Sequence, residues 1–75
     1  MDYDRKQETR QRVGMRLAAI RRQSGLTQAE VAERAGITAA NVARIEQGRY
    51  DVRLDVLQAI ADVFGMNVDF VNKQV

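Results

Sequence analysis

The sequence predicts an all-α domain with four or five short helices. Its 75 residues are enough for one domain. Between its glycines, apolar residues recur at the spacing of one face of a helix. Proline is absent, and a content of 45% hydrophobic and 29% charged residues is typical of a globular domain.

Composition excludes several kinds of chemistry. The chain has no Cys and no His, so zinc fingers, disulfide scaffolds, thiol nucleophiles and imidazole bases lack their residues. We therefore expect no enzyme, no metal site, no cofactor and, in so short a chain, no pocket for an effector. Residues 1–12 are polar, and no apolar run approaches the roughly 18 residues of a membrane helix, so a cytoplasmic protein is expected.

Glycines and capping residues set the expected helix boundaries. We expect a first helix over residues 9–24, with an apolar side that includes Leu17, and a fourth over residues 54–64. The buried stripe of the fourth should hold Leu54, Leu57, Ile60, Ala61 and Phe64. Gly14 lies inside the first predicted helix, where it indicates close packing or a tolerated defect. Asp51 and Asp55 are the one carboxylate pair of note, and favourable charge near the start of the fourth helix explains them best.

The middle of the chain predicts two short helices in steep contact. Thr27 and Glu30 have the spacing of a capping box, so a second helix begins after Thr27 and ends before Gly36. Thr38 is a suitable N-cap for a third helix. A turn of only three residues, built on Gly36, cannot place the two helices side by side, so they cross as in a helix-turn-helix.

Helical spacing assigns the two sides of the third helix. Val42 and Ile45 point inward, whereas the outward positions are Ala40, Ala43, Arg44 and Gln47. Small side chains with one long Arg suit close approach to a DNA major groove, and an Ala-rich helix covered by a protein partner is the alternative. Glu46 lies at the margin of the inward side and needs a cation, which Arg21 can supply, so we predict an ion pair between them.

The charge is unevenly distributed along the chain. The net charge is +2, but residues 1–25 carry seven basic and three acidic side chains, residues 26–50 three of each, and residues 51–75 two and four. Ten of the 12 basic residues are Arg, whose planar guanidinium binds phosphates and guanine edges better than Lys does.

Residues 28–48 resemble the helix-turn-helix of the phage-repressor, Cro and xenobiotic-response-element (XRE) family of DNA-binding regulators. The small Ala32 stands where the two helices touch, Gly36 stands in the turn, and Arg-Ile-Glu-Gln-Gly closes the third helix. The similarity extends over about residues 13–65. It implies a lambda-repressor-like domain at residues 9–65, preceded by a segment at residues 1–8 that we expect to be flexible.

The resemblance also implies roles for individual residues. By their positions in the family's motif, the residues that contact base edges would be Ala39, Ala40, Asn41 and Arg44. Phosphate contacts fall to Thr27, Gln28, Thr38 and Arg49. Glutamines often stand at the first recognition positions of phage repressors, but this chain has Ala39 and Ala40. Hydrogen-bonded specificity therefore rests on Asn41 and Arg44.

Residues 66–75 have the alternation of a β-strand. Met66, Val68 and Phe70 alternate with Asn67 and Asp69, so we expect a strand that pairs with a second copy and makes a homodimer. A short fifth helix, capped by Asn67, is the alternative.

These features together predict a sequence-specific double-stranded DNA-binding regulator of transcription, most simply a repressor, that acts as a homodimer on an inverted-repeat operator. One alternative is the antitoxin of a toxin–antitoxin pair, with a toxin as protein partner. The other is a protein interaction module that uses the Ala-rich third helix.

Overall fold

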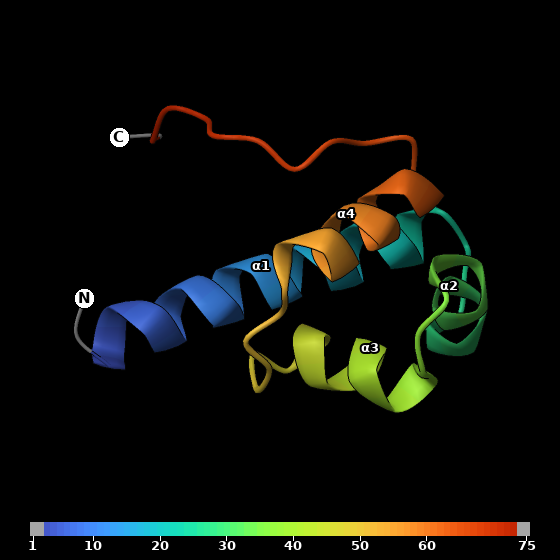
Figure 1. Cartoon of the computed structure of the whole chain (residues 1–75), viewed down its shortest axis with the longest axis horizontal. Coiled ribbons are helices and arrows are strands. Elements are labelled where there is room, and N and C mark those ends of the chain that lie inside the picture. The colour runs from blue at the N-terminus through green and yellow to red at the C-terminus, as the bar shows by residue number, and fades with distance from the viewer. Residues whose placement is uncertain (1–2, 74–75) are drawn as a thin grey trace.

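The computed structural model describes residues 3–73 and builds them from four helices. These are α1 (Tyr3–Gln23), α2 (Gln28–Ala35), α3 (Ala39–Glu46) and α4 (Leu54–Val63) (Figure 1). α1 packs on α3, and α2 packs on both α3 and α4. The predicted all-α class is confirmed, and none of the described helices is long and apolar enough to cross a membrane.

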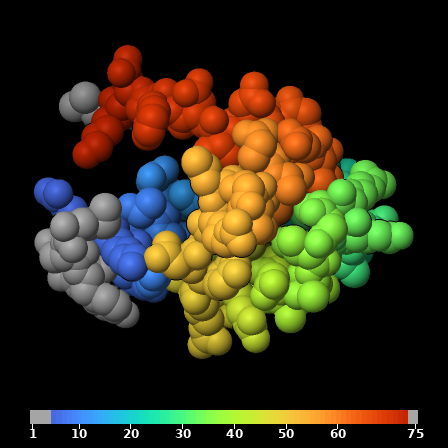
Figure 2. Space-filling model, viewed as in Figure 1, coloured from blue at the N-terminus to red at the C-terminus, as the bar shows by residue number. Residues whose placement is uncertain are grey.

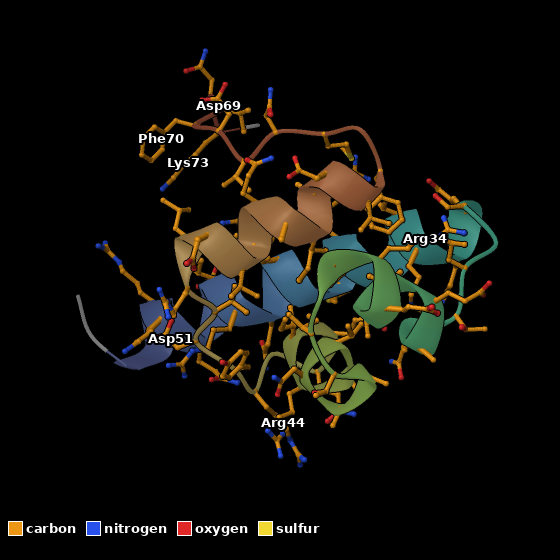
Figure 3. The ribbon with its side chains drawn as sticks, turned by 45° about the vertical axis from the view of Figure 1, so that its right-hand side comes forward. Arg34, Arg44, Asp51, Asp69, Phe70 and Lys73 are labelled. Atoms are coloured by element: carbon orange, nitrogen blue, oxygen red, sulfur yellow. The ribbon has the colours of Figure 1, made fainter. Side chains whose placement is uncertain are left out.

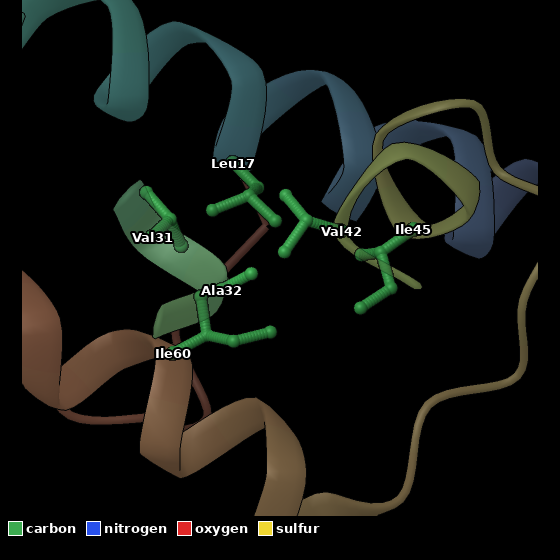
Figure 4. Close-up of a cluster of buried hydrophobic side chains, with 6 residues drawn as sticks. All are labelled: Leu17, Val31, Ala32, Val42, Ile45 and Ile60. Atoms are coloured by element: carbon green, nitrogen blue, oxygen red, sulfur yellow. The ribbon is translucent and has the colours of Figure 1, made fainter. Parts of the chain in front are cut away.

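One hydrophobic cluster holds the four helices together. Each helix contributes at least one buried side chain, and the members are Leu17, Val31, Ala32, Val42, Ile45 and Ile60 (Figure 4). Full burial of a Val, Leu or Ile side chain contributes about 1.5–3 kcal/mol, so this cluster is the main source of stability.

Local hydrogen bonds fix the ends of α2 and the start of α3. Thr27 Oγ1 accepts from the Glu30 N–H at 3.1 Å, while the Thr27 N–H donates to Glu30 Oε1 at 2.9 Å, which completes the predicted capping box. α2 ends at Gly36, whose φ of 75° is left-handed. Thr38 Oγ1 accepts from the Asn41 N–H at 3.1 Å and caps α3 as predicted.

α1 begins well before the predicted start at Thr9. Residues 3–8 continue this helix where the sequence predicted an irregular, flexible segment, and residues 1 and 2 lie outside the described part of the chain. Contacts to the α3–α4 connection hold this end: Gln7 Nε2 donates to the Gly48 carbonyl at 3.4 Å, and Lys6 pairs with Asp51 at 3.1 Å. These contacts join residues about forty positions apart, so helical periodicity alone did not reveal them.

The fourth helix departs from prediction at its first residue. Leu54 was expected in the buried stripe, but it is 70% exposed. Val56 packs on the core cluster in its place, together with Phe64. Ile60 is fully buried as expected.

Residues 66–73 form neither of the two predicted structures, because the structure gives them no strand and no helix. A strand needs a second strand for its backbone hydrogen bonds, and residues 3–73 supply none. The side-chain amide of Gln58 takes the place of a neighbouring strand for two backbone groups. Its Nε2 donates to the Met66 carbonyl at 3.2 Å, and its Oε1 accepts from the Val68 N–H at 3.0 Å. Beyond this attachment the segment stands away from the N-terminal half of α1 (Figure 2), with Phe70 fully exposed.

Candidate nucleic-acid interface

The outer side of α3 is a continuous exposed surface. Ala39, Ala40 and Arg44 are exposed, and Asn41 is half-buried beside them. Arg44 Nη1 donates to Asn41 Oδ1 at 3.2 Å, so the two predicted polar base readers lie together. Arg44 projects from the end of the molecule opposite Asp69 and Phe70 (Figure 3).

Behind this surface lies an ion pair between α1 and α3. Arg21 Nε donates to Glu46 Oε2 at 2.6 Å and Nη2 donates to Oε1 at 3.0 Å, so the pair is bidentate. Only 12% of the Arg21 side chain and 6% of the Glu46 side chain are exposed. The structure thus brings together the two residues whose pairing the sequence predicts.

Two further groups extend this pair into a network. Arg21 Nη1 donates to the Leu26 carbonyl at 3.0 Å, and Gln28 Nε2 donates to Glu46 Oε1 at 3.0 Å. Burial acts to raise the pKa of Glu46, but the hydrogen bonds from Arg21 and Gln28 outweigh it and leave that pKa below its ordinary value. The network therefore fixes the end of α3 relative to α1 and to the start of α2.

Gln28 has a role in this network that the sequence analysis missed. It was assigned to a phosphate by position, and in the structure its amide nitrogen is bonded to Glu46. The sequence carries no local signal for the contact, because the two residues are 18 positions apart on different helices.

α1 and α3 are in close backbone contact at Gly14. A Cβ placed there would overlap the carbonyl oxygen of Ile45 and would lie 2.8 Å from that of Glu46. Of the two interpretations of this glycine, the structure supports close packing. The backbone contact sets the depth at which α3 sits and therefore how far its outer side projects.

The remaining predicted phosphate contacts lie around α3. The hydroxyl oxygens of Thr27 and Thr38 accept cap hydrogen bonds, and each hydroxyl keeps its own hydrogen as a donor. Arg49 is exposed just after α3, and its N–H donates to the Arg44 carbonyl at 2.9 Å.

The connection after α3 differs from expectation at Asp51. The sequence predicts that its carboxylate interacts with the N-terminus of α4. In the structure its Oδ2 instead pairs with Lys6 Nζ at 3.1 Å and with Arg10 Nη2 at 3.3 Å. Hydrogen bonds from Lys6 and Arg10 lower the pKa of the Asp51 carboxyl. Asp55 does lie in the first turn of α4, and Tyr50 packs against the core.

These elements define a class of protein. Two short helices cross through a glycine turn, and the second exposes its outer side while its inner side is fixed to a long first helix. This is the arrangement of a helix-turn-helix in a lambda-repressor-like fold.

Comparison with known proteins gives the family. The profile of the helix-turn-helix domain family matches residues 12–71, and the chain belongs to this family. Among solved structures, it is similar to the clp gene regulator ClgR from Corynebacterium glutamicum, with a TM-score of 0.74 and 26% sequence identity. The match covers 77% of this chain and 62% of that one, so the chain spans less than two thirds of the regulator's length. No curated protein matches the chain.

Proposed function

We propose that this protein binds double-stranded DNA in a sequence-specific manner and regulates transcription, without enzymatic activity. The observation that carries the proposal is the exposed outer side of α3, with small residues at its start and Arg44 projecting from it. A major groove admits an α-helix, and small side chains let the helix approach the base edges. Membership of the helix-turn-helix family and the similarity to a gene regulator support it.

In the proposed complex α3 enters the major groove and the start of α2 lies on the phosphate backbone. Arg44 contacts guanine O6 and N7, Asn41 contacts an adjacent base, and Ala39 and Ala40 contact thymine methyl groups.

Phosphate contacts set the orientation of α3, and they are made by Thr27, Thr38 and Arg49. Gln28 acts chiefly through Glu46, because its amide nitrogen is engaged there. The proposal places this family member among the Cro and XRE regulators.

We further propose a repressor that acts as a homodimer on an inverted repeat. The exposed residues Met66, Val68 and Phe70 supply the contact between copies, on the side of the molecule away from Arg44. Two joined domains bind more tightly than one without any new base contact. With the two α3 helices about one DNA turn apart, the half-sites lie roughly 34 Å from centre to centre.

The test is selection of bound sites from random DNA, followed by affinity measurements on Arg44→Ala. The variant is expected to lose about 1–3 kcal/mol of binding free energy and to relax the preference at one base pair per half-site. Arg34→Ala is the matched control, because Arg34 is also exposed but lies on α2, well away from Arg44 (Figure 3). Equal losses on selected and random DNA would place Arg44 on a phosphate instead.

Salt dependence separates DNA binding from protein binding through α3. Binding of DNA releases counterions, so the affinity must fall steeply as salt rises. An α3 surface that packs on a protein through its alanines would show little dependence. A flat salt profile would therefore replace the proposed function with that of an interaction module.

An antitoxin that also represses its own operon is the second candidate. The observation that favours it is the exposed apolar segment of residues 66–71, which lies away from α3 and leaves the DNA surface free for simultaneous use. A toxin encoded next to this protein should co-purify with the full chain and be lost when residues 66–75 are removed. Retention of the toxin by the truncated chain would contradict this mode of binding.

A further inference from the structure

A hollow of about 440 Å³ lies between the N-terminal half of α1, the α3–α4 connection and α4. Its floor is apolar and is formed by Val13, Ile45, Val52 and Leu57. No pocket for an effector is expected in so short a chain, so the hollow departs from that prediction. The volume falls within the range of small-molecule sites, roughly 300–1,000 Å³.

The rim of this hollow is basic. Lys6 and Arg10 both pair with one oxygen of Asp51, Oδ2, at 3.1 and 3.3 Å, so the three side chains together carry one positive charge. Figure 3 places Asp51 beside the N-terminal half of α1. With 62% of the Asp51 side chain exposed, the pairs are of the weak, solvent-screened kind.

The geometry at Arg10 leaves a donor unused. Asp51 engages the guanidinium through Nη2 alone. Within the described chain, the buried Nε of Arg10 has no hydrogen-bond partner. A guanidinium binds a carboxylate best through two parallel N–H groups, which the Asp51 contact does not achieve.

We propose that this hollow binds a small monocarboxylic acid with an apolar body. The ligand carboxylate takes the place of Asp51 on Lys6 Nζ and Arg10 Nη2, and a turn of the Arg10 side chain brings its buried Nε to the second carboxylate oxygen. The apolar body lies on Val13, Val52 and Leu57. The site thus combines a net positive rim, an unused Arg donor and an apolar floor, which together match one class of ligand.

Hexanoate is a suitable probe, and hexanamide is its uncharged control of similar shape. In methyl and amide NMR spectra of this 8.5 kDa chain without DNA, hexanoate is expected to shift Val13, Val52 and Leu57. For so small a ligand the expected Kd is on the order of 1 mM. Hexanamide should bind about tenfold more weakly, because it lacks the charge that Arg10 and Lys6 select.

Two variants test the rim. Asp51→Asn removes the competing carboxylate and should strengthen hexanoate binding several-fold, whereas Arg10→Lys keeps the charge but removes the paired donors and should weaken it. Arg12→Lys is the matched control, because Arg12 is exposed on α1 and does not line this hollow. Equal shifts with hexanoate and hexanamide, shifts scattered outside the hollow, or indifference to Asp51→Asn would each overturn the proposal.

Binding at the hollow is expected to lower the affinity for DNA. This second step rests on the proposed function. Asp51 follows Arg49 by two residues, and Ile45 of α3 lines the hollow. Displacement of Asp51 is therefore expected to shift the backbone at Arg49, a proposed phosphate contact, and the position of α3. Titration of hexanoate into the complex with a selected DNA site should raise the Kd for DNA, and Arg10→Lys should reduce the effect. An unchanged Kd for DNA at saturating hexanoate would overturn the coupling, whereas the NMR titration without DNA judges the ligand site separately.

Discussion

Gly14 of α1 lies directly against the backbone of α3, and this contact makes it sensitive to a single added carbon. Gly14→Ala is expected to lower the free energy of unfolding by about 2 kcal/mol. The added methyl meets two backbone carbonyls that cannot move aside as a flexible side chain could. This penalty outweighs the roughly 1 kcal/mol that Ala gains over Gly in a helix. Urea denaturation measures the difference.

Met15→Ala is the control on the same helix. Met15 is 71% exposed, so its truncation should change stability by no more than about 0.5 kcal/mol. Unchanged stability of Gly14→Ala would mean that α1 and α3 are further apart in solution.

The ion pair of Arg21 with Glu46 is expected to matter more when it is broken than when it is replaced. Arg21→Met leaves a nearly buried carboxylate with Gln28 as its remaining donor, which should cost about 2–3 kcal/mol in thermal or urea unfolding. Arg21→Met combined with Glu46→Leu should recover most of the loss, because no charge is left buried. Arg22→Met, at the exposed neighbour, should be close to neutral. A double variant no more stable than Arg21→Met would contradict this account.

The same pair predicts a pH dependence of stability. Because the folded pKa of Glu46 lies below its ordinary value of about 4.3, the unfolded chain binds the proton more readily. The contribution of Glu46 to stability is therefore complete above pH 4.3 and is lost as the pH falls through the folded pKa. The difference between wild type and Glu46→Gln isolates this contribution from those of Glu30 and Asp51, whose pKa values are also lowered.

At the scale of the element, the start of α2 depends on its capping box. Thr27→Ala removes the oxygen that accepts from the Glu30 N–H, and it should cost about 1 kcal/mol, or roughly 4–8 °C in Tm for a domain of this size. Thr9→Ala is the matched control, because Thr9 is exposed inside α1 and caps no helix end. Equal changes in Tm for the two variants would contradict the importance of the cap.

The elements that sequence predicted best are those fixed by nearby residues. Thr27, Gly36 and Thr38 set helix ends through partners no more than five positions away, and the structure has all three ends where they were expected. The pairing of Arg21 with Glu46 was also predictable, because helical projection placed each at the margin of an apolar face. The donor from Gln28 and the start of α1 were not, because both depend on contacts between distant segments.

At the scale of the whole molecule, the sequence pattern of residues 66–71 predicts a β-strand that needs a second strand from another chain. Alternation of Met66, Val68 and Phe70 predicts a strand, but strand hydrogen bonds require a partner that the described chain lacks. Gln58 bonds residues 66 and 68 to α4 but offers no strand for the rest of the segment to pair with. The apolar side chains that result are exposed at the end of the molecule opposite Arg44.

Removal of residues 66–75 is therefore expected to abolish self-association without unfolding the domain. None of the six buried cluster residues lies in the deleted part, so Tm should change little. Sedimentation should show a dimer for the full chain and a monomer for the truncated one, and the truncated chain should keep half-site specificity while losing avidity on the palindrome. Phe70→Ser should weaken the dimer more than Asn72→Ser, because Phe70 offers a large apolar surface and Asn72 does not. A truncated chain that still sediments as a dimer on the same palindrome would place the dimer contact elsewhere on the helical domain.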